Sequence, residues 1–327
     1  MHDKRENMKA IYFEKTGRAE EVLVSGAIPR PVPGKEEVLI EVSASPIQPA
    51  DFLFMEGRYR KKPVFPQIAG FEGVGKVVDC GEAAAGQITP GMRVAFRSIG
   101  AWAEYALAPI SRIYPVPEGI PDELACQFSL NPLTAWGLLE ECGLAGPARI
   151  LATAGHSAVA RLLSELAKAR GIDVVLIARE DQGYRVTRQD EPLSWRPLLS
   201  EAVNDASEGG RFHAILDPVG GPDILSLIDA LEPGGKLISY GLLDDREITL
   251  RASMILSRNM IWQGFGIDGW LGRIPDERLK AAQKELWTML SVCPELLPVS
   301  GRFDYAEIGE AVRAARLTAG KGKVLIS

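Results

Sequence analysis

The central third of the chain alternates short apolar segments with amphipathic ones, and this alternation restricts the fold more than any other feature. Residues 148–154 and 173–178 are apolar runs that suit strands, and residues 159–170 between them place three leucines on one helical stripe. The run at 173–178 is apolar throughout, as expected of a strand covered on both faces of its sheet. The alternation continues at residues 213–216, 223–231 and 236–240. The pattern predicts parallel βαβ units in a doubly wound sheet.

The first third of the chain has short β-branched segments separated by dense turn signals. Four such segments lie at residues 9–13, 37–45, 73–78 and 93–95. They predict a compact, mostly β domain. Near the other end, two amphipathic helices at 277–290 and 305–316 precede a strand at 323–326, which we expect to rejoin the first domain. The sequence therefore predicts a split domain, residues 8–125 with 267–327, around an inserted domain at 126–266.

Net charge and cysteine content narrow the classes of partner. The formal net charge of -6 gives no electrostatic reason to expect nucleic acid or an anionic membrane. The 4 cysteines form no C-x-x-C pair, so neither a disulfide framework nor a structural zinc lobe is indicated. The polar N-terminus lacks the apolar stretch of a signal peptide, and no apolar run approaches the roughly 20 residues that span a bilayer. We expect a cytoplasmic protein that acts on a small molecule.

One βα turn has the character of a dinucleotide site. It lies between the strand at 148–154 and the following helix, where backbone N–H groups can hold a pyrophosphate. The G-x-G-x-x-G pattern is reduced to a single glycine, although the small Ala154 and Ala160 still permit a close approach of the backbone. The predicted cofactor contacts in this turn are Gly155, His156, Ser157 and Val159. An ordinary βα turn of an α/β protein is the alternative.

The end of the next strand bears on which dinucleotide binds. An acid there favours the free 2′-hydroxyl of NAD, whereas a basic residue favours the 2′-phosphate of NADP. The strand ends in Arg179, and the polar segment at 181–197 has no clear periodicity, so we expect it to be irregular. Two more arginines lie in this segment, Arg185 and Arg188. We interpret Arg179 as a 2′-phosphate ligand and predict NADPH. The adjacent Glu180 and Asp181 weaken this interpretation, and a solvated charged loop is the alternative.

Several motifs in order resemble the medium-chain dehydrogenase/reductase superfamily over nearly the whole chain. The N-terminal pattern comprises Pro33-Gly34, Glu37-Val38-Leu39-Ile40, Gly70-Phe71-Glu72-Gly73-Val74-Gly75 and Pro90-Gly91-Met92-Arg93-Val94. Within the superfamily, the chain is most similar to the 2-enoyl thioester reductase branch, which adjoins the quinone oxidoreductases. That similarity rests on Pro49-Ala50-Asp51, Gly57-Arg58-Tyr59, Asn131-Pro132-Leu133-Thr134-Ala135, Asp217-Pro218-Val219-Gly220-Gly221, Tyr240-Gly241-Leu242-Leu243 and the 264–270 segment. The resemblance implies a GroES-like, mostly β catalytic domain and a Rossmann domain with a doubly wound parallel sheet.

The resemblance also bears on zinc. Zinc-dependent members use a Cys in the segment occupied here by Gln48-Pro49, and a His directly before Glu72, where this chain has Phe71. The three histidines are scattered along the chain, at His2, His156 and His213. Zinc needs three or four converging N, S or O ligands. We therefore predict no metal.

The resemblance assigns roles to residues outside the turn. A tyrosine matching Tyr59 acts at the substrate carbonyl in enoyl thioester reductases, and a phenol can donate to a developing oxyanion. Quinone reductases often carry a tyrosine in the same loop, and simple packing is the alternative. Asn131 and Thr134 match residues that meet the nicotinamide, with helix capping by Asn131 as the alternative. Gly241 and Leu242 match the family's cofactor-contacting turn.

Two aromatic residues near the end of the inserted domain are candidates for an acyl pocket. Phe265 and Trp270 would line that pocket beside the nicotinamide, and Phe265 would also contact the cofactor. An aromatic pair in a strand and loop is often part of a core instead, so core packing is the alternative.

These observations favour reduction of an activated double bond over alcohol oxidation, because no metal is available to activate an alcohol. Hydride delivered to the β-carbon leaves an enolate that needs stabilisation and a proton. The sequence predicts NADPH-dependent reduction of a C=C bond, foremost in a 2-enoyl thioester. The alternatives are an NADPH:quinone or small-enone oxidoreductase and a non-catalytic NADPH-binding sensor or structural protein. The family is often dimeric, and the apolar segment 254–265 is the predicted edge at which a homodimer forms.

Overall fold

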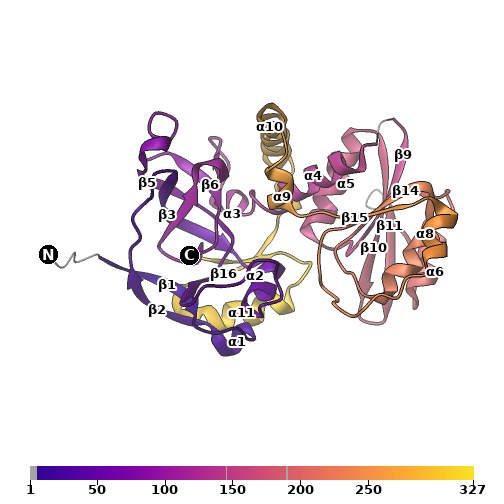
Figure 1. The fold of residues 1–327 in the computed structure, drawn as a ribbon, viewed down its shortest axis with the longest axis horizontal. Coiled ribbons are helices and arrows are strands. Elements are labelled where there is room, and N and C mark those ends of the chain that lie inside the picture. Colours follow the sequence, from indigo (N-terminus) through magenta and orange to yellow (C-terminus); the bar gives the residue numbers. More distant parts are fainter. Residues whose placement is uncertain (1–5, 145, 189–190) are drawn as a thin grey trace. The chain divides into compact units, whose positions relative to one another are not determined.

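The computed structural model describes residues 6–144, 146–188 and 191–327, and the chain divides into two compact units (Figure 1). The first unit comprises the chain up to Asn131 together with Gln283–Ser327, and the second comprises Pro132–Ala282. The second unit is therefore an insertion in the sequence of the first.

Helix α10 (Asp276–Val292) runs from the second unit into the first. Near its start, Arg278 forms an ion pair with Glu140 of the second unit. Further along, the ring of Trp287 stacks on Phe128 of the first unit at 3.6 Å between centroids. The division after residue 282 thus differs from the predicted boundary at 266/267, because the early turns of this helix pack with the second unit.

Two mainly antiparallel sheets form most of the first unit. One has the strand order β2-β1-β4, and the other has the order β16-β17-β3-β5-β6-β8, with β7 also pairing to β3. The strands are β1 (Asn7–Phe13), β2 (Val24–Pro29), β3 (Glu37–Pro46), β4 (Gln67–Ile68), β5 (Glu72–Cys80), β6 (Arg93–Arg97), β7 (Tyr105–Pro109), β8 (Ile113–Pro115), β16 (Val299–Phe303) and β17 (Lys323–Ile326). Because β17 pairs with β3, the C-terminal strand completes the sheet begun by the N-terminal third.

Short helices cover the sheets of the first unit. They are α1 (Ala19–Val22), α2 (Pro49–Met55), α3 (Asp122–Ala125) and α11 (Ile308–Leu317). Helix α2 begins after Gln48, where a carboxyl oxygen of Asp51 accepts the Gln48 N–H in a capping box and Pro49 occupies the first turn. A core of buried apolar side chains, including Phe13, Phe54 and Trp102, lies beneath α2 and α11.

A seven-stranded sheet organises the second unit, with the order β12-β11-β10-β9-β13-β14-β15. The five strands from β10 to β15 in this order are mutually parallel. They are β9 (Ala148–Thr153), β10 (Ile172–Glu180), β13 (Phe212–Asp217), β14 (Leu231–Ser239) and β15 (Ile261–Gly264), and the helices are α4 (Asn131–Cys142), α5 (Ala158–Ala169), α6 (Leu199–Ala206), α7 (Leu225–Ile228), α8 (Ala252–Arg258) and α9 (Ile267–Leu271). This arrangement confirms the predicted α/β class.

The segment at 181–197 is not the irregular loop that its composition predicts. It forms β11 (Gly183–Arg188) and β12 (Glu191–Arg196), which extend the sheet antiparallel to β10. Arg185 and Arg188 therefore lie on a strand. Alternation is hidden in the sequence because β12 is exposed at nearly every position and a bulge after Val186 shifts its register.

Strand β14 also begins earlier than the predicted strand at 236–240. Residues Pro233, Gly234 and Gly235 lie inside β14, and the pairing with β13 shifts there from Phe212↔Leu231 to Ala214↔Lys236. A shift of this kind lets a strand carry Pro and Gly without ending.

No helix among residues 6–144, 146–188 and 191–327 is both long enough and apolar enough to cross a membrane.

Candidate functional site

The turn after β9 approaches the neighbouring strand closely. The Gly155 N–H donates to the Ile177 carbonyl at 3.0 Å. A Cβ on Gly155 would lie 3.0 Å from the Cβ of Leu176 and 3.3 Å from that of Ala178, so a side chain there would require the strand to move. The preceding Ala154 has a φ of 51°, a left-handed conformation that few non-glycine residues adopt. The turn is therefore tight, and a single glycine suffices for it.

Helix α5 starts directly from this turn. The Ser157 hydroxyl caps it by accepting the Ala160 N–H at 3.1 Å. In any helix the first N–H groups have no acceptor within the helix, so those of Ala158 and Val159 are available to an anion. The partial positive charge of the helix start adds to this preference, and His156 beside it has a side chain that is 52% exposed. The site can hold a diphosphate.

Charged side chains cluster where β10 ends. Arg179 is exposed, and its side chain makes no hydrogen bond or ion pair with the described residues, although its charge helps to lower the pKa of Asp244. The carboxylate of Glu180 accepts two hydrogen bonds from the Arg185 guanidinium, at 2.5 and 3.1 Å, and lies 3.7 Å from Nε2 of His156. The Arg185 hydrogen bond lowers the pKa of Glu180. The cluster carries two guanidinium charges against one carboxylate.

A buried polar group that the sequence analysis did not assign to the site lies behind the turn. The Thr153 hydroxyl donates to the Asp217 carboxylate, which also accepts the Gly220 N–H at 2.7 Å. Burial raises the pKa of Asp217, and these hydrogen bonds oppose the rise. Burial also raises the pKa of Tyr240, whose hydroxyl is hydrogen-bonded by Ser157. The sequence feature that could have identified Asp217 and Tyr240 as site residues is their position at the ends of two predicted strands, 213–216 and 236–240.

The turns that follow β13 and β14 are joined to each other. The Asp244 N–H donates to the Val219 carbonyl at 2.7 Å. A Cβ on Gly241 would lie only 2.4 Å from the Pro218 carbonyl oxygen, so this close approach requires glycine. The next residue, Leu242, is 40% exposed. The structure thus places Gly241 and Leu242 at the same edge of the sheet as Gly155 and Ser157, the edge formed by the carboxyl ends of the parallel strands.

In the first unit, Tyr59 lies just after helix α2. Its N–H donates to the Leu53 carbonyl at 3.0 Å, which holds the loop against the helix. Its half-buried ring packs on Phe71 at 5.1 Å and on Phe54 at 6.5 Å between centroids. Its hydroxyl has no hydrogen-bond partner among the residues that the structure describes. The packing explains how the ring is held and leaves the hydroxyl available to a substrate.

Also in the first unit, a buried chain of polar side chains ends at Asn131. Gln48 donates through Nε2 to the Glu72 carboxylate at 2.6 Å and accepts the Asn131 amide N–H at 3.4 Å. The Ser129 hydroxyl lies 2.9 Å from the other oxygen of Glu72. Since the Gln48 NH₂ group donates to Glu72, the Gln48 carbonyl oxygen faces Asn131 and accepts from the Asn131 NH₂ group. The carbonyl oxygen of Asn131 therefore remains available to another donor. The structure therefore engages Asn131 through Gln48.

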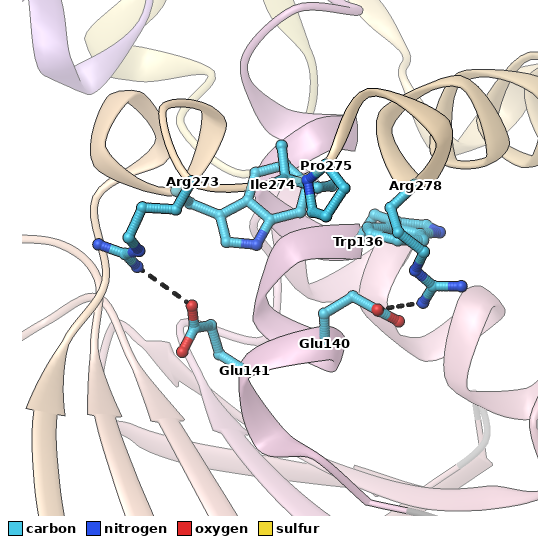
Figure 2. Close-up of a pocket in the computed structure, with 8 residues that line it drawn as sticks. Trp136, Glu140, Glu141, Arg273, Ile274, Pro275 and Arg278 are labelled. Atoms are coloured by element: carbon cyan, nitrogen blue, oxygen red, sulfur yellow. Dashed lines mark hydrogen bonds and ion pairs between the residues drawn. The ribbon is translucent and has the colours of Figure 1, made fainter.

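Thr134, Phe265 and Trp270 lie in the second unit. Thr134 is buried in helix α4. The rings of Phe265 and Trp270 are buried, 6.3 Å apart, and both face Gly137 of α4. Trp270 borders a cavity of about 210 Å³ whose charged rim is formed by Glu140, Glu141, Arg273 and Arg278 (Figure 2). Phe265 does not line that cavity, and the carboxylates and guanidiniums of its rim form ion pairs with one another.

Comparison with known proteins shows consistent similarities. Residues 34–118 match the family described as "Alcohol dehydrogenase GroES-like domain". The mitochondrial enoyl-acyl-carrier-protein reductase of Xenopus tropicalis is 27% identical over 86% of this chain and 82% of its own. A candidate NADPH:quinone reductase from Mesorhizobium loti has the same fold with a TM-score of 0.85, 27% identity and 98% coverage of both chains. A second candidate NADPH:quinone reductase, from Bacillus thuringiensis, gives 0.84 and 25%, over 98% of this chain and 99% of its own.

The chain is similar to members of the medium-chain dehydrogenase/reductase superfamily. Its similarities lie on the branch that contains the enoyl reductases and quinone oxidoreductases.

Gln48-Pro49 and Phe71 stand where the resemblance places the Cys and the His of zinc-dependent members. Here Gln48 and Glu72 bond to each other, and Phe71 packs against Tyr59. In the described parts of the chain, no three His, Cys, Asp or Glu side chains gather as metal ligands would. The oxygen atoms of Glu72 are instead occupied by hydrogen bonds from Gln48 and Ser129.

Asp51 lies beside this network and predicts a pH dependence of stability. Burial raises its pKa to about 8 from 3.8, although the Gln48 N–H opposes the rise. The folded state therefore holds a proton that the unfolded chain loses near pH 4, and stability falls as the pH rises from about 4 to about 8. In Asp51→Asn the thermal midpoint should fall less between pH 5 and pH 8 than in the wild type, and at pH 8 the variant should melt higher.

The matched control is Asp79→Asn, which changes an exposed carboxyl of the same unit. It should leave the pH dependence of the thermal midpoint as in the wild type. Parallel melting profiles of Asp51→Asn and wild type across this pH range would contradict the assignment of a shifted carboxyl to Asp51.

Proposed function

We propose that the chain uses NADPH to reduce an activated C=C bond, with a 2-enoyl thioester as the substrate class. The observation that carries the proposal is the likeness to the Xenopus tropicalis enoyl-acyl-carrier-protein reductase, which spans 86% of this chain and 82% of that protein. The helix start at the β9–α5 turn and the exposed Arg179 support NADPH, because they offer separate sites to a diphosphate and a 2′-phosphate.

The residues at the sheet edge fit a dinucleotide. Gly155 and Gly241 occupy positions where a Cβ would crowd neighbouring protein atoms, so both turns stay tight at this edge of the sheet. We assign the diphosphate to Gly155, His156, Ser157 and Val159, the 2′-phosphate to Arg179, and the nicotinamide half to Asn131, Thr134, Gly241, Leu242 and Phe265. When bound, NADPH would supply a hydride to the substrate.

Tyr59 would handle the charge that hydride addition leaves on the substrate. Addition to the β-carbon places negative charge on the thioester oxygen, and a phenol can donate a hydrogen bond or a proton to it. The hydroxyl has no protein partner among the described residues, so a substrate oxygen would not have to displace one. Phe265 and Trp270 remain our proposed acyl-pocket residues, and their buried rings pack against Gly137 of α4.

The reaction is tested by following NADPH oxidation with crotonyl-CoA, longer enoyl-CoA substrates and a set of quinones. The fold shared with the two candidate NADPH:quinone reductases makes quinone reduction the second candidate function. We expect a higher kcat/KM with an enoyl thioester than with any quinone. Faster quinone turnover would favour the second candidate, and NADPH binding without turnover of any acceptor would favour a sensor or structural protein.

Tyr59→Phe tests the proton donor. Removing the hydroxyl while keeping the ring should lower kcat with an enoyl thioester by more than about tenfold, because a positioned donor contributes at least that much. The KM for NADPH should change little. Tyr105→Phe is the matched control, since Tyr105 packs beneath Arg30 and has no proposed role. An unchanged kcat in Tyr59→Phe would remove the tyrosine from the mechanism.

We also propose a homodimer formed at the β15 edge of the second unit's sheet. Strand β15 ends the sheet, Ile261 on it is 46% exposed, and Leu256 on the adjacent α8 is 80% exposed. An exposed edge with apolar neighbours is suited to pairing with a second copy.

A cytoplasmic location is likewise our proposal, and the names of the curated relatives place those proteins in mitochondria.

Leu256→Glu should convert the dimer, with twice the 35.5 kDa mass of one chain, into a monomer in light scattering at micromolar concentration. The matched control is Leu193→Glu on β12, at the opposite edge of the same sheet, where Leu193 is 50% exposed and Pro192 opposes strand pairing. A wild-type monomer, or a dimer lost only in the Leu193 variant, would contradict the proposed interface.

A further inference from the structure

Strand β11 runs antiparallel to β10 and places Arg185 beside the end of β10. The antiparallel register pairs Ala178 with Arg185 and Glu180 with Gly183, so the chain reverses within a few residues of the strand end. Arg185 then binds Glu180 through two hydrogen bonds, from Nε at 2.5 Å and from Nη2 at 3.1 Å. This two-point geometry is the strongest form of the arginine–carboxylate contact. A helix and a parallel strand would follow β10 in an ordinary doubly wound sheet, and neither would bring Arg185 to this place.

Glu180 lies on the side of β10 that faces the β9–α5 turn. A Cβ on Gly155 would contact Leu176 and Ala178, and side chains alternate along a strand, so the side chain two residues on points the same way. The 3.7 Å separation between Glu180 and His156 agrees with this placement. A carboxylate at this strand end accepts the 2′-hydroxyl of NAD and repels a 2′-phosphate. By its position alone, Glu180 would favour NADH.

We propose that Arg185 determines cofactor specificity by occupying and neutralising Glu180, so that Arg179 can bind the 2′-phosphate of NADPH. This inference rests on the proposed use of NADPH. With Arg185 present, Arg179, Glu180 and Arg185 carry a net charge of +1. Without Arg185 the net charge is zero, and the Glu180 carboxylate is released toward the ribose.

The exposure of the pair supports a role in binding rather than in folding. The side chains of Arg185 and Glu180 are 41% and 27% exposed, and an ion pair of this exposure contributes little to stability. Its loss should therefore change the local charge and leave the fold intact. Arg188 on the same strand donates one hydrogen bond to Asp173 at 2.8 Å, opposite Val175 and away from the strand end, and Asp173 also accepts from Arg149. Arg188 thus offers a matched control.

The test measures dissociation constants of NADPH and NADH by titration of protein fluorescence at low salt. Wild type should bind NADPH more tightly than NADH. Arg185→Ala should weaken NADPH binding on the order of tenfold, as expected for one uncompensated charge near a phosphate, and should leave NADH binding equal or tighter. Adding Glu180→Gln to Arg185→Ala should restore most of the NADPH affinity. Arg188→Ala should match wild type for both dinucleotides.

The outcomes separate the inference from the proposed function. Equal weakening of NADPH and NADH by Arg185→Ala, or no recovery on adding Glu180→Gln, would overturn the specificity role and show a structural one. A wild-type chain that binds NADPH tightly with an unchanged preference in Arg185→Ala would overturn the inference and leave the proposed function standing. A wild type that binds neither dinucleotide, or prefers NADH, would overturn the proposed cofactor together with the inference.

Discussion

The contact between the β9–α5 turn and strand β10 is the constraint on which the rest of the nucleotide edge depends. Gly155 donates to the Ile177 carbonyl and has no room for a side chain without moving β10. This contact holds the capped start of α5 next to the last residues of β10. As a result, the helix N–H groups that suit a diphosphate and the charged residues from Arg179 onward lie on neighbouring loops of a single unit. A motif with one glycine is sufficient because Ala154 itself adopts the left-handed conformation.

In the first unit the corresponding constraint is the burial of Glu72. A carboxyl with no exposed surface is tolerated only when its oxygens are hydrogen-bonded, and burial raises the pKa of Glu72 even though Ser129 and Gln48 bond to it. Those bonds orient the Gln48 amide, which in turn orients Asn131. Gln48 therefore has two effects: it donates a hydrogen bond to the buried carboxyl of Glu72, and it determines that the carbonyl oxygen of Asn131 is left for a ligand.

The sequence predicted the parallel core of the second unit well and its edge poorly, for physical reasons. Buried strands such as β10 are apolar on both faces, and α5 has a clear stripe, so their periodicity is visible in the residues. Strand β12 is held by backbone pairing with almost no burial, which leaves no periodic signal. The sequence left a solvated charged loop open as the alternative for Arg185 and Glu180, because only the antiparallel register brings them together. Likewise, the burial of Phe265 and Trp270 against Gly137 could not be distinguished from a pocket lining before the fold was known.

The hairpin also explains how a strand end with mixed charges can serve one cofactor. Arg179, Glu180 and Asp181 follow one another, so in the linear sequence two acids that suit NAD weaken the preference for NADP that Arg179 indicates. The folded structure strengthens the preference for NADP, because Arg185 already occupies the carboxylate of Glu180 with two hydrogen bonds. The guanidinium of Arg179 has no hydrogen-bond partner among the described residues and can donate to a ligand. The choice between NAD and NADP at such an edge thus depends on which charged side chains are already paired within the protein, and not only on which charged residues the sequence contains. The same principle applies at Glu72, where hydrogen bonds from Gln48 and Ser129 occupy the oxygens that a metal would otherwise need.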